Sequence, residues 1–297
     1  MGSDSGPRPG STVIGLDFLY SFENTAAAPY YPLEGLAGCS YSPDGTLIFC
    51  DELRGKVFGL DPSTRRWFEF AAPNRRSFNP VDVRVDGFRV LVLDQADGSI
   101  QHFDLSGAWR DELVDVRQLD PGAVVHPSCF AVDQDGRMVI GDAGQQEVLL
   151  LDSFLGLHTR VGGPGPMDDQ FQDPAGIVFR NDGSFLVSDR GNRRLSLYGR
   201  NGFFEGAVGG DFDRNNPFLS PRGLDVDRFG NVFVADQGSG LIHVMDRRLH
   251  VNFSAGHDFD LAGTPLAPVD LAVGPNDELA VTDRARSAIL VYRIIYQ

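Results

Sequence analysis

The chain has 297 residues, a formal net charge of −15 and 42% hydrophobic residues. This apolar content is sufficient for a sizeable core and too high for a disordered chain. No stretch approaches the roughly 18–20 consecutive apolar residues that are needed to cross a bilayer. The overall acidity argues against a nucleic-acid-binding surface, which is typically basic.

The N-terminal segment, MGSDSGPRPGS, lacks the charged and apolar regions of a signal peptide, and Gly6 stands where a myristoylation motif needs Ser or Thr. We interpret residues 1–11 as a flexible arm or a remnant of cloning, and leave open whether a native export signal precedes them. The run STVIGLDFLYSF, residues 11–22, is strand-like, but no hairpin partner follows it directly.

Two cysteines flank the first predicted hairpin turn. Asp44-Gly45 is typical of a two-residue turn, and such a turn makes Cys39 and Cys50 face each other across the two strands. A longer loop would offset them. Two states stay open: adjacent buried thiols, or a cross-strand disulfide, which would indicate an oxidising compartment. With Cys129 as the third cysteine, the spacing matches no zinc motif.

From residue 47 onward one pattern recurs six times, as a short apolar run that ends in Asp, a polar turn and another apolar run. The aligned residues are Asp51, Asp94, Asp142, Asp189, Asp236 and Asp283. A further short run lies upstream in each copy, mostly after a Pro, as in DPAGIVF from Asp173. A period of about 47 residues indicates one supersecondary unit that is copied many times.

Each copy contains about four short apolar runs that are rich in Val, Phe, Leu and Ile and separated by Gly, Asp, Asn and Pro. This is typical of strands and turns. Four strands per copy, repeated radially, predict an all-β, six-bladed β-propeller with four-stranded antiparallel blades. The last copy lacks an outer strand, so we expect the N-terminal strand to complete the last blade and close the ring.

The six aligned aspartates are predicted to be turn residues. Their carboxylates can accept hydrogen bonds from backbone N–H groups of the loop that follows each strand. An active site needs its catalytic groups once, whereas this aspartate recurs in every copy.

Residues 173–204, DPAGIVFRNDGSFLVSDRGNRRLSLYGRNGFF, resemble an NHL repeat. The matching positions are Pro174, Gly176, Asp182-Gly183, Asp189, Gly191-Asn192 and Arg194. The resemblance covers nearly all of residues 12–297, which we predict to form a single NHL-type propeller. It implies a non-enzymatic platform for protein partners or self-assembly, without a cofactor. It favours an extracellular or cell-envelope location, with the cytoplasm as the alternative.

Some propellers similar to this family are enzymes, namely amidating lyases with a zinc held by channel histidines and lactonases with a metal held by channel Asp, Glu and Asn. The first residues of the innermost strands should face the channel, and these are Gly38, Asp82, Cys129, Gly176, Gly223 and Asp270. Only His126 is placed for a zinc site. The alternative function is therefore a metal-dependent, lactonase-like hydrolase that uses Asp82, Asp270 and Asp173. Arg222 is equally well placed to neutralise Asp270.

A second alternative, implied by animal NHL proteins, is RNA binding, which needs a basic face with aromatic side chains. Arginines do lie on the loops of one face, but acidic residues such as Asp168 and Asp211 share it, so nucleic acid is not the expected partner. We expect a rigid protein-binding platform. The partner-binding candidates are Arg190, Arg193, Arg194, Arg222, Arg284 and Arg286.

Overall fold

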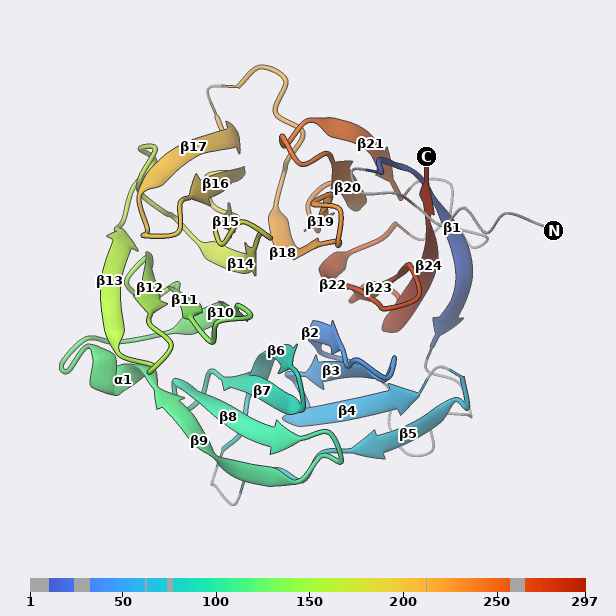
Figure 1. The fold of residues 1–297 in the computed structure, drawn as a ribbon, viewed down its shortest axis with the longest axis horizontal. Coiled ribbons are helices and arrows are strands. Elements are labelled where there is room, and N and C mark those ends of the chain that lie inside the picture. The colour runs from blue at the N-terminus through green and yellow to red at the C-terminus, as the bar shows by residue number, and fades with distance from the viewer. Residues whose placement is uncertain (1–10, 24–32, 62, 74–76, 212, 257–264) are drawn as a thin grey trace.

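A computed structural model describes residues 11–23, 33–61, 63–73, 77–211, 213–256 and 265–297. Six four-stranded antiparallel sheets form blades around a central channel (Figure 1). The prediction of an all-β, six-bladed propeller is confirmed. In the described residues the single helix is α1 (Val116–Leu119), and no described helix is long and apolar enough to span a membrane.

Each blade runs from an innermost strand at the channel to an outermost strand at the rim (Figure 1). Blade one contains β2 (Leu36–Tyr41), β3 (Leu47–Asp51), β4 (Lys56–Asp61) and β5 (Arg66–Glu69). Blade two contains β6 (Pro80–Asp86), β7 (Arg89–Asp94), β8 (Ser99–Asp104) and β9 (Trp109–Asp115). Blade three contains β10 (Pro127–Val132), β11 (Met138–Asp142), β12 (Glu147–Leu151) and β13 (Leu157–Gly162).

The second half of the ring repeats this order. Blade four contains β14 (Pro174–Phe179), β15 (Phe185–Asp189), β16 (Arg194–Tyr198) and β17 (Phe204–Gly209). Blade five contains β18 (Pro221–Val226), β19 (Val232–Asp236), β20 (Leu241–Met245) and β21 (Val251–Ala255). Blade six contains β22 (Pro268–Val273), β23 (Glu278–Asp283), β24 (Ala288–Tyr296) and, as its outermost strand, β1 (Val13–Phe22).

The ring is closed by the N-terminal strand, as predicted. β1 pairs antiparallel with β24, and the register runs from Val13 opposite Tyr296 to Phe22 opposite Ile289. The two ends of the propeller therefore share one blade, and the edge of β24 is covered. Residues 1–10, most of the predicted N-terminal arm, lie outside the described residues. The carbonyl of Ser11 accepts a hydrogen bond from the Asn231 side chain.

The core of the described chain consists of apolar clusters that lie between neighbouring blades. The cluster between blades two and three, for example, combines Leu91 of β7 with Phe130 of β10 and Leu149 of β12. Both faces of a blade are therefore covered by other blades. This explains why the inner strands are apolar at nearly every position, because strands buried on both faces do not alternate polar and apolar residues.

The six repeated aspartates are turn residues, as predicted. All are buried, and each accepts hydrogen bonds from backbone N–H groups of the loops around it. Asp189 is typical: its Oδ1 accepts from the N–H groups of Gln172, Asp173 and Asn192 at 3.1–3.3 Å. Each aspartate ties the loop before its blade to the turn after its second strand.

The cysteine pairing predicted from the Asp44-Gly45 turn is wrong. The Thr46 carbonyl accepts a hydrogen bond from the Ser42 N–H at 2.9 Å, so the loop is longer than two residues and the register of the two strands shifts by one. Cys39 therefore faces Phe49, in the core between blades six and one. Cys50 points to the opposite side, toward blade two. All three cysteines are free and buried.

Candidate functional site

A cavity of about 450 Å³ lies at one end of the channel, where the innermost strands begin. Five of the six predicted channel positions line it: Gly38, Asp82, Gly176, Gly223 and Asp270. Cys129, the sixth, is buried in the core between blades three and four. Every innermost strand has an irregularity in its pairing at this point. Such irregularities redirect side chains, and here they lie beside the cavity.

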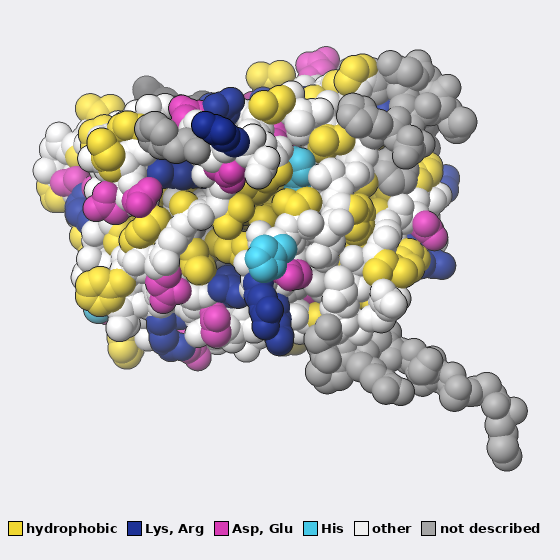
Figure 2. Space-filling model, turned by 90° about the horizontal axis from the view of Figure 1, so that it is seen from above, with side chains coloured by type: hydrophobic (Ala, Val, Ile, Leu, Met, Phe, Trp, Pro, Cys, Tyr) yellow, Lys and Arg dark blue, Asp and Glu magenta, His cyan; other side chains and the backbone are white. Residues whose placement is uncertain are grey.

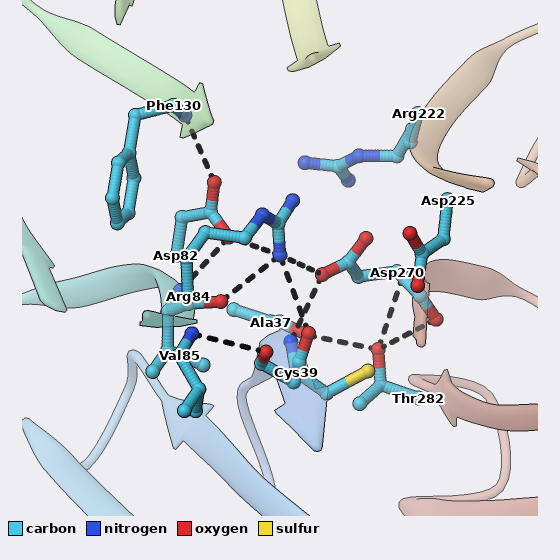
Figure 3. Close-up of polar contacts among 12 residues, drawn as sticks. Ala37, Cys39, Asp82, Arg84, Val85, Phe130, Arg222, Asp225, Asp270 and Thr282 are labelled. Carbon is cyan, nitrogen blue, oxygen red and sulfur yellow. Dashed lines mark hydrogen bonds and ion pairs between the residues drawn. The ribbon is translucent and has the colours of Figure 1, made fainter. Parts of the chain in front are cut away.

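The floor of the cavity holds two carboxylates and one arginine. Asp82 and Arg84 lie on β6, and Asp270 lies on β22, on the other side of blade one (Figure 3). The Arg84 Nη1 atom is 3.0 Å from Asp82 Oδ1 and 3.3 Å from Asp270 Oδ2. Arg84 also donates to the Cys39 carbonyl at 3.2 Å. One guanidinium thus bridges blades six, one and two at the channel.

The same carboxylates join neighbouring blades through backbone hydrogen bonds. Asp82 Oδ2 accepts from the Phe130 N–H at 3.0 Å, and Asp270 Oδ2 accepts from the Cys39 N–H at 2.9 Å. Each of these two carboxylates lies against a glycine of the neighbouring blade, where a larger residue would not fit. A Cβ on Gly38 would lie 2.6 Å from Asp82 Oδ1, and one on Gly223 would lie 2.0 Å from Asp270 Oδ1. The glycines at these channel positions therefore make room for the carboxylates.

Burial changes the acidity of the channel carboxyls. Desolvation raises the pKa of Asp82 to about 7, because burial disfavours its charged form; Arg84 opposes this shift and Asp270 adds to it. Burial likewise raises the pKa of Asp225, on β18 beneath the cavity, to about 6. Asp82 can therefore change its protonation state near neutral pH, which is a property of acid–base groups in active sites.

Three arginines surround the mouth of the cavity. The Arg190 Nε donates to Asp173 Oδ2 at 2.6 Å, and Arg284 forms an ion pair with Glu52. Arg222 has no carboxylate partner among the described residues, and its Nη1 donates to the neutral Gln237 side chain at 2.9 Å. Burial, together with the nearby positive charges of Arg190 and Arg284, lowers the pKa of Arg222 to about 10. Arg222 thus contributes the positive charge that the mouth does not neutralise.

The sequence-based assignment of a partner to Asp270 is wrong. Arg222 forms no ion pair with it, and Figure 3 shows the two side chains apart while Arg84 contacts Asp270. The sequence alignment marks only the first channel-facing position of each innermost strand, and Arg84 is the second such position on β6. A signal was present: side chains two apart on a strand share a face, and Arg84 follows Asp82 by two on the same strand.

The six arginines that were predicted to bind a partner do not form one cluster in the structure. Arg190, Arg222 and Arg284 line the cavity. Arg193 pairs with Asp211, away from the lining, with Nε to Oδ1 at 2.9 Å. Arg194 is buried, and its guanidinium donates to the carbonyls of Met167 and Gln170. Arg286 follows the buried Asp283 and donates its N–H to that carboxylate.

Two other predicted features are the zinc-binding histidine and a basic face for RNA. Among the described histidines, His126 alone lines the cavity, beside Gln95. Figure 2 shows acidic and basic side chains intermixed on the side of the molecule that it presents. The side that Figure 2 presents shows no uniformly basic track for a phosphate backbone.

A divalent metal does not fit the channel carboxylates. The Arg84 guanidinium lies between Asp82 and Asp270, in the position that a bridging cation would need. Asp173, the third predicted ligand, lies at the mouth and pairs with Arg190. In the described part of the chain no group of three or more His, Cys, Asp and Glu side chains is arranged to hold a metal ion.

No protein-family model matches the sequence, and no curated protein matches it. Many solved structures share its fold. A streptogramin B lyase is 13% identical, with a TM-score of 0.67 over 93% of this chain and 98% of that one. A luciferin-regenerating enzyme is 17% identical, with a TM-score of 0.68 over 94% of this chain and 95% of that one. A putative gluconolactonase is 15% identical, with a TM-score of 0.68 over 97% of this chain and 95% of that one.

These similarities correct the expectation that the chain is not an enzyme. The structures that share its propeller along nearly their whole length include enzymes, so the fold gives no ground for a purely non-enzymatic platform. At this level of identity the similarity establishes the six-bladed propeller alone, and the NHL assignment stays a prediction. What the chain does must be argued from its own residues.

Proposed function

We propose that the chain is a hydrolase that hydrolyses small carboxylic esters or lactones in the channel cavity. The observation that carries the proposal is the Asp82 carboxyl, whose pKa is raised to about 7 at the floor of a cavity of about 450 Å³. A general base is most effective when its pKa lies near the working pH. The propeller shared with a putative gluconolactonase supports the same class of reaction.

The chemistry requires only residues of the chain. Asp82 takes a proton from a water molecule as the water oxygen attacks the carbonyl carbon of the ester. The bond from that carbon to the leaving oxygen breaks, the leaving oxygen takes up the proton that Asp82 carries, and the new carboxylic acid releases its own proton to the solvent. Arg84 holds Asp82 in place through its Nη1 contact at 3.0 Å. No step passes through a metal ion.

Substitution of Asp82 by Asn separates this chemistry from the structural role of the side chain. An Asn Oδ1 can still accept from the Phe130 N–H, but it cannot take up a proton. The Asn amide NH2 then faces Arg84 and the Val83 N–H, both donors, so a control for folding is needed. We expect Asp82→Asn to lower kcat by about 100-fold or more while the fold is retained. The assay follows proton release from a panel of lactones and aryl esters, with thermal unfolding as the control for folding.

The pH profile and a chelator complete the test. Since the base must be ionised, the rate in the wild-type protein should rise with pH through about 7 and then level off. Addition of EDTA should leave it unchanged. The proposal is wrong if no compound in the panel is hydrolysed, if Asp82→Asn retains the full rate, or if EDTA abolishes the activity.

A further inference from the structure

The two ends of the cavity carry opposite charge. At the mouth, Arg190, Arg222 and Arg284 face two carboxylates, Asp173 and Glu52, so one positive charge is left over. At the floor, Arg84 faces Asp82 and Asp270, so one negative charge is left over when both carboxyls are ionised. A molecule that enters this cavity meets a fixed positive charge first and a negative group beneath it.

The surplus positive charge belongs to Arg222. Arg190 and Arg284 are each occupied by a carboxylate, whereas the guanidinium of Arg222 has only the Gln237 amide oxygen as a partner among the described residues. Figure 3 shows its side chain extending from β18 toward the floor cluster. An arginine that is largely shielded from water and lacks an anionic partner is a ready receptor for one, because its fork of N–H groups matches a carboxylate.

Arg222 is also held rigidly. Its backbone carbonyl accepts a hydrogen bond from the Ser188 hydroxyl at 2.5 Å, which ties β18 to blade four. Gln237, which holds the guanidinium, directly follows the buried turn residue Asp236. A binding side chain that starts from a fixed strand and is oriented by a second group loses little freedom when the ligand arrives.

The remaining lining limits the rest of the ligand. Small apolar side chains lie among the polar ones of the wall, namely Ala37, Val81, Ala143, Ala175 and Val269. They offer contact to an apolar body of modest size. The cavity volume of about 450 Å³ is within the range of small-molecule sites.

We propose that Arg222 is the anion-binding residue of the cavity and that its ligand is a small carboxylate with an apolar body. That this ligand is also the substrate rests on the proposed hydrolase function. The substrate would then be a lactone or ester that carries a carboxylate. The binding of the carboxylate does not depend on turnover, so it is tested separately.

The binding test compares benzoate with benzamide by isothermal titration calorimetry on the full chain at low ionic strength. The two compounds share shape and apolar area, and differ in charge. We expect benzoate to bind about tenfold or more tightly than benzamide, and Arg222→Met to remove this preference. Arg193→Met is the matched control: it removes an arginine that is paired with Asp211 outside the cavity lining, and it should leave the preference intact.

Two further variants keep the result interpretable. Arg222→Lys retains the charge but not the fork, and should recover part of the preference if the folded protein is otherwise intact. Gln237→Ala removes the group that orients the guanidinium, and should weaken benzoate binding less than Arg222→Met does. Thermal unfolding shows that each variant is folded, and Arg222→Gln replaces Arg222→Met if the latter is not.

The outcomes separate the two proposals. Equal affinity of the wild-type protein for benzoate and benzamide, or an undiminished preference in folded Arg222→Met, overturns the anion site. A preference that depends on Arg222 in a protein that hydrolyses no lactone or ester supports the anion site and overturns the hydrolase. Hydrolysis that is equally fast for neutral and carboxylate-bearing lactones, and unaffected by Arg222→Met, overturns the naming of the carboxylate as the substrate, whereas the benzoate titration decides the anion site.

Discussion

Replacement of Arg84 by Met should destabilise the protein strongly and in a pH-dependent way. The guanidinium contacts two buried carboxylates at 3.0 and 3.3 Å. With an effective dielectric constant of about 20, each contact corresponds to a Coulomb energy of about 5 kcal/mol. The cost of burying Arg84 offsets part of this sum, and the loss of one partner from a buried ion cluster typically costs about 3–5 kcal/mol. For a chain of this length the melting temperature should fall by about 10 °C.

The pH dependence follows from the channel carboxyls. Because Asp82 and Asp225 have raised pKa values of about 7 and 6, the folded state binds more protons than the unfolded state between about pH 4 and 7. Wild-type stability therefore falls as pH rises through this window. Arg84 lowers the pKa of both groups, so its loss raises these values further and extends the fall to higher pH.

Urea unfolding at pH 5 and pH 8 measures both effects. We expect Arg84→Met to cost several kcal/mol at pH 8 and clearly less at pH 5, where Asp82 and Asp225 are protonated. Arg137→Met is the matched control, because Arg137 is about as buried as Arg84 but pairs with a single carboxylate, Asp133, outside the cavity lining. It should cost less at pH 8. An Arg84→Met cost below about 1 kcal/mol, or one that is the same at both pH values, refutes the reasoning.

Three further predictions concern the scaffold. Deletion of residues 1–23 removes β1 and exposes the edge of β24, so it should cause aggregation or a large fall in melting temperature; a stable monomer would contradict this. The three buried cysteines should react with a thiol reagent only after denaturation, and a non-reducing mass that is two hydrogens short would show otherwise. Gly223→Ala should destabilise the protein because the new Cβ would lie 2.0 Å from Asp270 Oδ1, whereas Gly206→Ala, with open space around it, should be close to neutral in thermal unfolding.

The fold was predictable because its unit is repeated. Six aligned aspartates, each followed by a turn and another apolar run, define the blades, and the unpaired run at residues 11–22 indicates the closure by β1. Repetition averages out local ambiguity in strand and turn assignment. The channel positions of Asp82 and Asp270 followed from the same alignment and lie where it places them.

The features that differ between blades were not predictable in this way. The contact of Arg84 with Asp270 joins two strands that are far apart in sequence, and the described part of the other innermost strands shows no arginine in the same place. The positions of Cys39 and Cys50 depend on a turn that is longer than Asp44-Gly45 suggests, and one residue of shift moves a side chain to the other face of a strand. Asp225 was missed for the same reason as Arg84, since it lies two residues beyond the channel-facing Gly223.

The pairing of β1 with β24 also sets the order in which the molecule can be assembled. Of the described strands, β1 is synthesised first and its partner β24 last. At about 5–20 residues per second, synthesis of the chain takes on the order of 15–60 seconds. During this time the N-terminal strand has no sheet to join, while blades one to five can form from neighbouring segments. Closure of blade six is therefore the step with the highest contact order, and the nascent chain carries β1 as an unpaired strand until β24 has been synthesised.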